Sequence, residues 1–564
     1  MRTISIGKQR FDSIRENNYF YIDKTDFIKE WWEAGDEVTL ITRPRRFGKT
    51  LNMNMLECFF SNCYANRADL FEGLSIWQEE KYQKLQGTYP VISLSFADVK
   101  QKNYQDAVTK IKKIFVETYE KYMNIADWDG FTENEKRKIL SISQDMSDVD
   151  AQSCIKELCN CLSRYYGKNV IVLMDEYDTP MQEAYLGGYW EEFTGFIRSM
   201  FNATFKTNPY LERAIMTGIT RVSKESIFSD LNNLNVVTTT SCEYATAFGF
   251  TENEVFQALE EAGMPQEKEI VKEWYDGFTF GTIKDIYNPW SITNFLKKKQ
   301  FQTYWADTSS NGLVGNLIQK GTIEVKENME LLLKGEPIKV SIDEQIIFNQ
   351  LDEDENAIWS LMLASGYLKV IHVKKTDDEG EILEEPVYTL NITNKEVTNM
   401  FIKMFKGWFT KSAGNYNGFI KALLSENVKE MNAYMNKVAL ATFSSFDTGT
   451  HPSETAEPER FYHGFVLGLL VELREKYEVS SNRESGLGRY DVMLIPKRGQ
   501  EKAFVLEFKV HDTTEEATLE DTVQSALRQI EEKKHETMLI EKGVRQENIR
   551  RYGFAFEGKT VLIG

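Results

Sequence analysis

The stretch that decides the fold runs from Val38 to Phe60 and reads VTLITRPRRFGKTLNMNMLECFF. Its first five residues are a short, mostly apolar and β-branched run, and the loop that follows is basic and contains a proline. Leu51, Met55, Leu56 and Phe59 then recur at helical spacing. The pattern predicts strand, loop and helix. Such a junction points the first backbone N–H groups of the helix at the loop, which makes the loop a site for an anion, above all a phosphate.

The end of this loop carries half of a known phosphate-binding signature. Gly48-Lys49-Thr50 matches the second half of GxxxxGK[ST], in which the glycine lets backbone approach phosphate, the lysine charge meets the β- and γ-phosphates and the hydroxyl ligates Mg²⁺. Arg43 occupies the position of the leading glycine. The alternative interpretation is a basic surface turn in which Arg43, Arg45 and Arg46 are simply solvated.

A second segment favours the nucleotide interpretation. Residues 169–174, NVIVLM, form a continuous apolar run, as expected of a strand buried on both faces of a parallel sheet, and Asp175 and Glu176 follow it. In a nucleotide site of this type Asp175 would hold Mg²⁺, and Glu176 would orient and deprotonate the attacking water. Alone, such a strand more often just meets solvent at its acidic end. Together with the upstream loop it predicts a P-loop NTPase.

Five segments closely resemble the bacterial AAA-ATPase-like family, whose variant loop also reads RPRRFGK[ST]. They are Tyr21-Ile-Asp-Lys-Thr25, Arg43-Pro-Arg-Arg-Phe-Gly-Lys-Thr50, Asp175-Glu-Tyr-Asp178, Thr217-Gly-Ile-Thr-Arg221 and Tyr287-Asn-Pro-Trp-Ser291. Members of this family commonly carry a C-terminal PD-(D/E)xK nuclease-like domain. The resemblance implies that ATP and Mg²⁺ are held by Arg45, Arg46, Gly48, Lys49, Thr50 and Asp175, with Glu176 as the base.

The next expected core strand, Arg213 to Gly218, ends in a hydroxyl residue. In NTPases of this type a polar residue there senses the γ-phosphate, so Thr217 is a candidate for nucleotide binding. Arg221 lies close enough in sequence to reach the same charge. An ordinary strand followed by a turn is the alternative interpretation, and the resemblance favours the functional one.

The whole chain is expected to be an α/β protein with a P-loop parallel-sheet core. The order of strand, helices and strand over residues 38–175 implies right-handed crossovers. We expect an ATPase domain over 1–285, in which 274–291 acts as a lid or hinge, and a mostly helical middle region over 286–446. That region contains a β-hairpin over 368–392, for which a winged helix is one interpretation. Acidic runs at 352–355 and 377–381 argue against DNA there and favour a protein-facing adaptor or a scaffold.

A polar linker at 447–458 precedes a last domain, 459–564, expected to have an α/β restriction-endonuclease-like fold. Residues 489–509 have a hairpin pattern. If its turn centres near Gly499, antiparallel pairing sets Asp491 across from Glu507, and Glu507 and Lys509 share a face. This is the PD-(D/E)xK arrangement: Asp491 and Glu507 would bind Mg²⁺, with Mn²⁺ as an alternative ion, and Lys509 would position the attacking water.

An ExK pair in a strand is often only a solvated face, but the paired Asp491 favours the nuclease-like fold. Residues 481–491 resemble the family's approach to its catalytic aspartate, with Glu484 as a further acid. Gln529 stands on the following helix where the family has a glutamine. Six residues later this chain has His535 where the family tends to have tyrosine, which leaves an auxiliary part of the site in doubt.

Composition narrows the class of protein. The net charge of −19 argues against a protein coated for non-specific DNA binding, but residues 459–564 hold 17 Lys and Arg against 19 Asp and Glu, so DNA is least disfavoured there. Arg483, Arg489, Lys497 and Arg498 could line its approach. The six cysteines lack a zinc-type pair and are expected to be reduced thiols. An N-terminus without an apolar core and the lack of long apolar runs predict a cytoplasmic protein without membrane contact.

The sequence therefore predicts an ATP-hydrolysing protein coupled to a Mg²⁺-dependent nuclease-like domain that acts on nucleic acid, DNA in the first place. Genome defence or the processing of mobile DNA is the corresponding biological hypothesis. One alternative is a nucleotide-switch interaction protein whose nuclease fold is a non-cleaving scaffold, and another is a chain that binds ATP but barely hydrolyses it. A homo-oligomer and an unknown protein partner both stay open.

Overall fold

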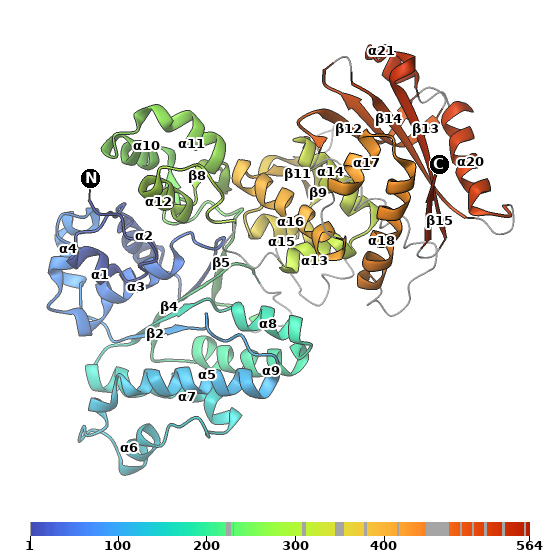
Figure 1. Cartoon of the computed structure of the whole chain (residues 1–564). Coiled ribbons are helices and arrows are strands. Elements are labelled where there is room, and N and C mark those ends of the chain that lie inside the picture. The colour runs from blue at the N-terminus through green and yellow to red at the C-terminus, as the bar shows by residue number, and fades with distance from the viewer. Residues whose placement is uncertain are drawn as a thin grey trace. The chain divides into compact units, whose positions relative to one another are not determined.

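A computed structural model divides the chain into two compact units (Figure 1). The N-terminal unit contains Met1–Ser310 and Pro337–Val397, and the C-terminal unit contains Asn311–Glu336 and Thr398–Gly564. The structure describes residues 2–221, 227–228, 231–306, 312–343, 355–376, 381–413, 417–446, 468, 473–485, 488–498, 501–511, 516–532, 536–557 and 560–564.

The core of the N-terminal unit is a five-stranded sheet with the order β2-β3-β4-β1-β5, in which every neighbouring pair is parallel. Its strands are β1 (Val38–Thr42), β2 (Val91–Ser95), β3 (Val170–Asp175), β4 (Leu211–Gly218) and β5 (Leu234–Val237). The parallel sheet predicted from the sequence is confirmed. All six residues of β3 are buried, which explains its unbroken apolar run.

The helices of this unit follow the strands as crossover connections. Figure 1 shows α5 (Tyr104–Glu120), α7 (Asp148–Tyr166) and α9 (Trp190–Phe201) as a layer along the sheet. α3 (Lys49–Phe60) begins directly after the predicted phosphate loop, and α8 (Thr179–Gly187) follows β3. The remaining helices before β4 are α1 (Phe11–Glu16), α2 (Asp26–Ala34), α4 (Glu80–Leu85) and α6 (Glu133–Leu140).

Residues 250–298 form a small subdomain with its own three-stranded sheet, ordered β6-β8-β7. Its elements are β6 (Phe250–Thr251), α10 (Glu252–Glu261), α11 (Lys268–Tyr275), β7 (Phe278–Phe280), β8 (Ile283–Tyr287) and α12 (Pro289–Lys298). One apolar cluster joins its helices to Ile4 and Phe20 of the N-terminal segment. Asn288 caps α12 by accepting hydrogen bonds from the backbone N–H groups of Trp290 (2.9 Å) and Ser291 (3.3 Å), and Pro289 takes the first helical position.

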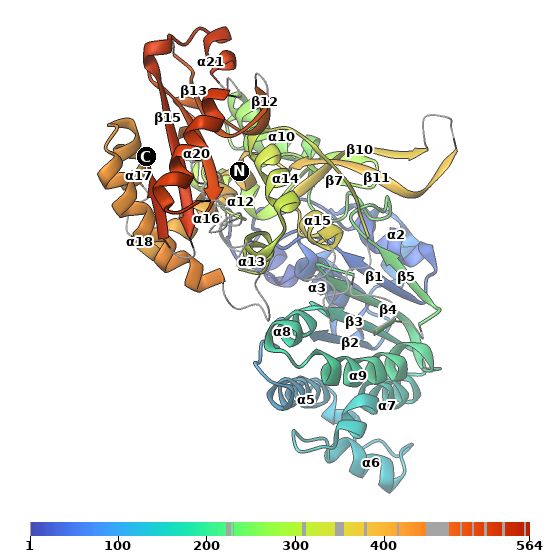
Figure 2. The same ribbon diagram turned by 90° about the vertical axis from the view of Figure 1, so that its right-hand side faces the viewer.

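The predicted hairpin of the middle region is confirmed. Strands β10 (Leu368–Thr376) and β11 (Ile382–Ile392) pair antiparallel, and β9 (Ile338–Ser341) adds a third strand beside β11 (Figure 2). α15 (Glu355–Ala364) precedes the hairpin and α16 (Lys395–Ala413) follows it. Most of the two acidic runs, 352–354 and 377–380, lies outside the described residues.

The C-terminal unit is built on a five-stranded sheet with the order β12-β13-β14-β15-β16. Only the β14–β15 pair is parallel among these strands, which are β12 (Tyr477–Ser485), β13 (Gly488–Pro496), β14 (Ala503–Val510), β15 (Ile549–Glu557) and β16 (Thr560–Ile563). α20 (Leu519–Glu532) packs on β14 and β15, and α21 (Thr537–Glu541) follows. The helix predicted over 459–476 lies mainly outside the described residues.

Helices that precede the linker also belong to this unit. They are α13 (Gly312–Lys320), α14 (Ile323–Lys334), α17 (Asn417–Leu424) and α18 (Val428–Phe446). Asn432 of α18 bonds both the N–H and the C=O of Ile563, at 2.8 Å each, and Asn436 does the same for Val561, at 2.9 and 2.6 Å. These amides satisfy the outer backbone groups of edge strand β16, as a neighbouring strand would.

The two units divide the middle region 286–446 between them, because α12 lies in the N-terminal unit and α17 and α18 lie in the C-terminal one. The boundaries 1–285, 286–446, 447–458 and 459–564 stay predictions.

Candidate functional site

The predicted nucleotide residues follow three parallel strands at the same edge of the sheet. Thr42, the last residue of β1, pairs with Gly218 of β4, and Asp175 ends β3 beside Ser95 of β2. Because the carboxyl ends of parallel strands meet at one edge, loop 43–48 and the acidic pair 175–176 are brought together. Ligands of open α/β sheets bind in the crevice at this edge.

The loop turns into α3 through two residues with left-handed backbone. Arg46 has φ 65° and Gly48 has φ 84°, and α3 begins at Lys49. Glycine adopts this conformation without steric penalty, whereas an arginine needs support from its surroundings. The Lys49 side chain is buried inside the loop, where its Nζ donates to the carbonyls of Arg43 (2.9 Å) and Pro44 (3.0 Å).

Asp175 lies at the centre of a hydrogen-bonded group. The Thr50 hydroxyl donates to its Oδ2 at 2.6 Å, and the Thr217 hydroxyl donates to its Oδ1. Burial raises the pKa of Asp175, the nearby Glu176 carboxylate raises it further, and the two hydroxyl donors lower it. A hydroxyl and a carboxylate in direct contact at a cavity are the hard oxygen ligands that Mg²⁺ prefers, so these residues fit the ion expected from the sequence.

Glu176 stands beside this pair with a left-handed backbone, φ 56°. Its Oε2 accepts a 2.9 Å hydrogen bond from the hydroxyl of Thr179, in the first turn of α8. A non-glycine residue with such a φ is uncommon and clusters at functional sites. The sequence analysis did not single out Thr179, although a hydroxyl three residues after an acid at a helix start is a readable signal.

Asp175, Glu176, Lys49 and Thr50 line a cavity of about 780 Å³ in the N-terminal unit. Arg45, Arg46 and Gly48 line it as well, and so do residues 5–9 and 20–22 of the N-terminal segment. This volume lies within the range of small-molecule sites. The cavity therefore brings together seven of the nine residues predicted for the nucleotide site.

The two remaining residues, Thr217 and Arg221, do not line this cavity. Thr217 is fully buried behind Asp175 and reaches the site only through that carboxylate. Arg221 is half-buried just after β4. A direct role of either residue toward the γ-phosphate stays a prediction.

Arg43 is not a solvated surface residue. Its side chain is fully buried, and its guanidinium donates to the carbonyls of Thr42 (2.9 Å), Thr238 (2.7 Å) and Glu243 (3.0 Å). It also lies 4.5 Å from the ring centre of Phe280. Burial lowers the pKa of Arg43 to about 9, so the guanidinium stays charged at neutral pH. The interpretation of 43–46 as a solvated turn is wrong for this residue, because the loop uses Arg43 as an internal brace.

The 250–298 subdomain, part of which was expected to be a lid or hinge, contacts the loop directly. The Asn288 side chain donates to the carbonyl of Arg45 at 3.2 Å, and the guanidinium carbon of Arg46 lies 4.5 Å from the ring centre of Trp290. Phe47 packs edge-on against two phenylalanines of β7, Phe278 (4.8 Å between ring centres) and Phe280 (5.4 Å). The subdomain thus holds three consecutive loop residues.

The DEYD and TGITR segments interlock behind the site. Asp178 is fully buried, and its Oδ2 accepts from the backbone N–H groups of Ile219 and Thr220, both at 2.8 Å. The Tyr177 hydroxyl donates to the carbonyl of Thr220 at 2.8 Å. A Cβ added to Gly218 would lie 2.7 Å from Asp178 Oδ1 and from the Tyr177 ring. The two segments therefore fix each other and the end of β4.

In the C-terminal unit the predicted hairpin register holds. Val492 pairs with Leu506, Met493 with Val505 and Leu494 with Phe504, and one more step of this register sets Asp491 opposite Glu507. The side chain of Asp491 lies outside the described part of the structure, as do those of Arg483 and Arg489. Its role as a metal ligand stays a prediction.

Glu507 and Lys509 both face α20. Gln529 of α20 donates to Glu507 Oε1, and Lys509 Nζ donates to the Ser525 hydroxyl at 3.1 Å. Glu507 is only 1 % exposed. His511, two residues further along the strand, contacts the Thr522 hydroxyl at 2.8 Å. Alternate residues of β14 thus meet one face of α20, and Gln529 stands where the resemblance implies. His535 lies outside the described residues.

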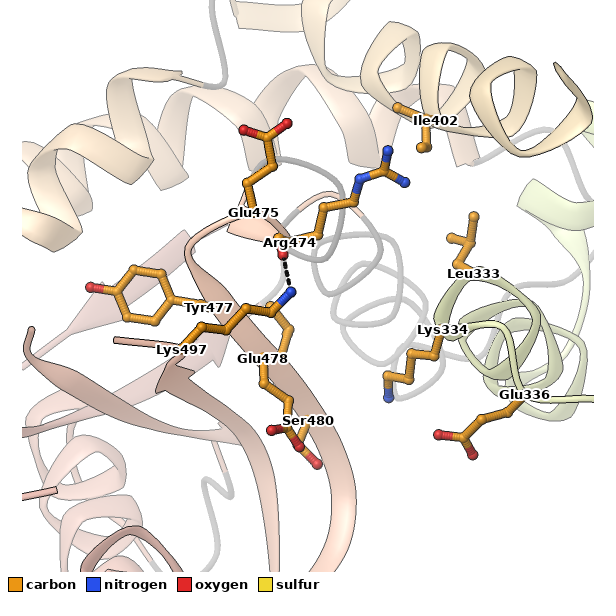
Figure 3. Close-up of a pocket in the computed structure, with 11 residues that line it drawn as sticks. Leu333, Lys334, Glu336, Ile402, Arg474, Glu475, Tyr477, Glu478, Ser480 and Lys497 are labelled. Atoms are coloured by element: carbon orange, nitrogen blue, oxygen red, sulfur yellow. Dashed lines mark hydrogen bonds between the residues drawn. The ribbon is translucent and has the colours of Figure 1, made fainter. Parts of the chain in front are cut away.

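A second cavity, of about 560 Å³, lies in the C-terminal unit beside β12 and helices α14 and α16 (Figure 3). Its lining carries the cations Lys334, Arg474 and Lys497 and the acids Glu336, Glu475 and Glu478. Lys497 donates to the carbonyl of Arg474 at 2.6 Å. Glu507 and Lys509 do not line this cavity, and its charges balance, so it carries no nucleic-acid argument.

Among the residues that the structure describes, one acidic group lies close enough to share a cation: Glu252, Asp276 and Asp285 of the 250–298 subdomain. The ammonium of Lys272 already lies there. It contacts Glu252 and lies 3.7 Å from Asp285 and 4.0 Å from Asp276. Within the described ranges no helix is long and apolar enough to cross a membrane.

Comparison with known proteins gives two family matches and a relative. Residues 5–228 match the family described as predicted AAA-ATPase, and residues 457–564 match the PD-(D/E)XK nuclease superfamily. An uncharacterized protein in the vnfD 5′ region of Azotobacter chroococcum mcd 1 is 25 % identical over 398 residues, which cover 70 % of this chain and 68 % of that protein. The chain thus joins an AAA-ATPase-like region to a C-terminal region of the PD-(D/E)XK nuclease superfamily, the architecture that its motifs predict.

Proposed function

We propose that the chain hydrolyses ATP and uses the nucleotide cycle to control a metal-dependent nuclease-like domain that acts on nucleic acid, in the first place DNA. The observation that carries the proposal is the group at the end of the 780 Å³ cavity, where Lys49, Thr50, Asp175 and Glu176 meet at the carboxyl edge of a parallel sheet. The two family matches support the same pairing of activities.

Each residue of the nucleotide site has a defined task in this proposal. The N–H groups at the start of α3 and the Lys49 ammonium bind the β- and γ-phosphates. Thr50 and Asp175 hold Mg²⁺, which neutralises charge on the phosphates when bound. Glu176 accepts a proton from the attacking water, and Asp175 stays ionised because Thr50 and Thr217 donate to it.

In the C-terminal domain Asp491 and Glu507 hold Mg²⁺ or Mn²⁺, which polarises the scissile phosphate when bound. Lys509 positions the attacking water on the face of the sheet that it shares with Glu507. Gln529 orients the Glu507 carboxylate by donating to one of its oxygens.

The experiment is cleavage of circular DNA, linear DNA and RNA by the purified full-length chain with Mg²⁺ or Mn²⁺, with and without ATP, while ATP turnover is measured in parallel. We expect Glu507→Ala and Lys509→Ala to abolish cleavage and to keep ATP turnover. Glu176→Gln is expected to abolish turnover and to change the ATP dependence of cleavage. A Glu176→Gln protein with unchanged turnover would show that the chain binds ATP without using Glu176 as the base.

One observation favours the scaffold alternative, in which the nuclease fold binds without cleaving. Glu507 is 1 % exposed and is engaged by Gln529, so a metal ion can reach it only if α20 or its side chains shift. Nucleic acid that is bound but not cut under any condition, beside measurable ATP turnover, would favour this alternative. So would a cellular phenotype that survives Lys509→Ala.

A further inference from the structure

We propose that Arg45 is the residue that compensates the charge developing on the γ-phosphoryl group, so that the phosphate loop supplies its own catalytic arginine. This inference rests on the proposed ATP hydrolysis and adds to it a residue with a specific task. It explains why a loop without the leading glycine keeps two consecutive arginines at the cavity, since the structure gives them different surroundings.

The two arginines turn toward opposite walls of the cavity. Arg45 is half-buried, and its Nη2 donates to Oε1 of Gln182, on α8, at 3.4 Å. Arg46 is exposed and stacks on Trp290 of α12 with 4.5 Å between the guanidinium carbon and the ring centre. All four residues line the cavity. Arg45 therefore belongs to the wall formed by the helix after β3, and Arg46 belongs to the 250–298 subdomain.

The wall that Arg45 contacts is also the one that holds the predicted base. Thr179 and Gln182 are three residues apart on α8 and thus neighbours on one helix face. Thr179 donates to Glu176 at 2.9 Å, and Gln182 accepts from Arg45. A single helix face thus brings the carboxylate and the guanidinium to the same side of the cavity. The γ-phosphoryl group and its attacking water belong on this side, because Glu176 must reach that water.

The chemistry explains the need for a second cation there. A bond forms between the water oxygen and the γ-phosphorus, and the bond from that phosphorus to the β–γ bridging oxygen breaks. The water proton passes to Glu176, and ADP and phosphate leave. Negative charge spreads over the equatorial and bridging oxygens on the way. Lys49 supplies one point charge from the floor of the loop, while a planar guanidinium can bind two phosphate oxygens at once.

The contact with Gln182 fits a residue that exchanges partners. At 3.4 Å the hydrogen bond is long, and its acceptor is a neutral amide. A phosphate oxygen offers a charged acceptor, and such hydrogen bonds are about twice as strong as neutral ones. Gln182 therefore acts as a positioning residue that holds Arg45 on the correct wall.

The test uses the full-length chain and compares Arg45→Ala, Arg45→Lys, Gln182→Ala and Arg46→Ala with the surface control Arg67→Ala. Arg67 is paired with Asp69 and Glu16 outside the cavity. The measurements are kcat and KM for ATP, together with equilibrium affinities for ATP and ADP by calorimetry in a Glu176→Gln background. Removal of an arginine finger lowers kcat by roughly 10³-fold or more.

We expect Arg45→Ala to lower kcat by about 10³-fold, to leave ADP affinity within a factor of three and to abolish the preference for ATP over ADP. Arg45→Lys should regain little of the rate, and Gln182→Ala should lower kcat by about 10-fold with the ATP preference kept. Arg46→Ala should act mainly on KM, and Arg67→Ala should match the wild type.

An Arg45→Ala protein that keeps kcat within a factor of three, or that loses ATP and ADP affinity equally, would overturn the proposal and leave Arg45 as a structural loop residue. A wild-type chain without turnover would instead refute the proposed hydrolysis. The ratio of ATP to ADP affinity would still decide whether Arg45 contacts the γ-phosphate. The two failures are therefore distinguishable.

Discussion

Replacement of Arg43 by glycine restores the leading glycine of the ordinary phosphate-loop signature, yet the structure predicts that Arg43→Gly destabilises the protein. The guanidinium donates to three backbone carbonyls in the interior, two of them, at Thr238 and Glu243, about 200 residues away along the chain. Its removal leaves those carbonyls without a donor and opens a cavity beside Phe280. The glycine also adds about 0.5–1 kcal/mol of backbone entropy to the unfolded chain.

The size of the effect follows from opposing contributions. Hydrogen bonds to a charged group contribute about 1.5–3 kcal/mol each, and the contact with a ring about 1 kcal/mol. The desolvation of the buried charge opposes this by several kcal/mol and disappears with the side chain. Water entering the cavity recovers part of the carbonyl loss. The net expectation is about 3 kcal/mol of lost stability, or about 6 °C in unfolding temperature at roughly 2 °C per kcal/mol for a unit of this size.

The assay heats the full-length chain in steps, applies a brief protease pulse and follows peptides of each unit by mass spectrometry. The C-terminal unit then serves as an internal reference. Arg43→Met, which keeps most of the side-chain volume but no donor, should lower the unfolding temperature of the N-terminal unit in the same direction by a smaller amount. Arg46→Ala, an exposed neighbour in the same loop, should change it by less than about 2 °C. An Arg43→Gly protein that unfolds within 1 °C of the wild type would refute the bracing role.

Three further outcomes are expected. Burial raises the pKa of Asp276 to about 7, so its protonated form stabilises the fold fully below about pH 4 and this contribution is lost as pH rises through 7; the unfolding temperature of Asp276→Asn should therefore gain on the wild type between pH 5 and 8, and a constant difference would contradict the shift. Gly218→Ala places a Cβ 2.7 Å from Asp178 and should cost about 1–3 kcal/mol in chemical denaturation, while Gly195→Ala, with open space around its Cβ, should not; equal stability of the two variants would count against the interlock behind the site. Gln529→Ala should weaken Mn²⁺ binding, measured by calorimetry, about 10-fold, and Gln524→Ala on the exposed face of α20 should not; unchanged binding would exclude Gln529 as a partner of a metal-bound Glu507.

The sequence predicts those parts of the two sites that depend on local periodicity. The apolar run before Asp175 and the helical spacing after Lys49 place both residues at strand ends, and the structure brings them to one cavity. Arithmetic along the hairpin predicts the register that pairs Asp491 with Glu507, because side chains in strands alternate with a period of two.

Contacts between distant segments leave no such local signal. A buried arginine and a solvated one look alike in the sequence, so the partners of Arg43 could not be read from it. Asn288 followed by proline is a readable helix start, but its contact with the carbonyl of Arg45 joins positions 243 residues apart. The same holds for Asn432 and Asn436, whose helical surroundings give no sign that they complete the edge of a sheet.

These distant contacts make the hinge hypothesis specific. Asn288 joins the loop to the start of α12, and one turn later the Ser291 hydroxyl donates to Glu396 at 2.8 Å. Glu396 is buried and also accepts from the backbone N–H groups of residues 304–306. It lies in the first turn of α16, whose later residues belong to the C-terminal unit. A shift of the loop on binding phosphate therefore cannot leave α12 and the start of α16 undisturbed unless one of these hydrogen bonds breaks, and each broken bond would leave a buried polar group without its partner.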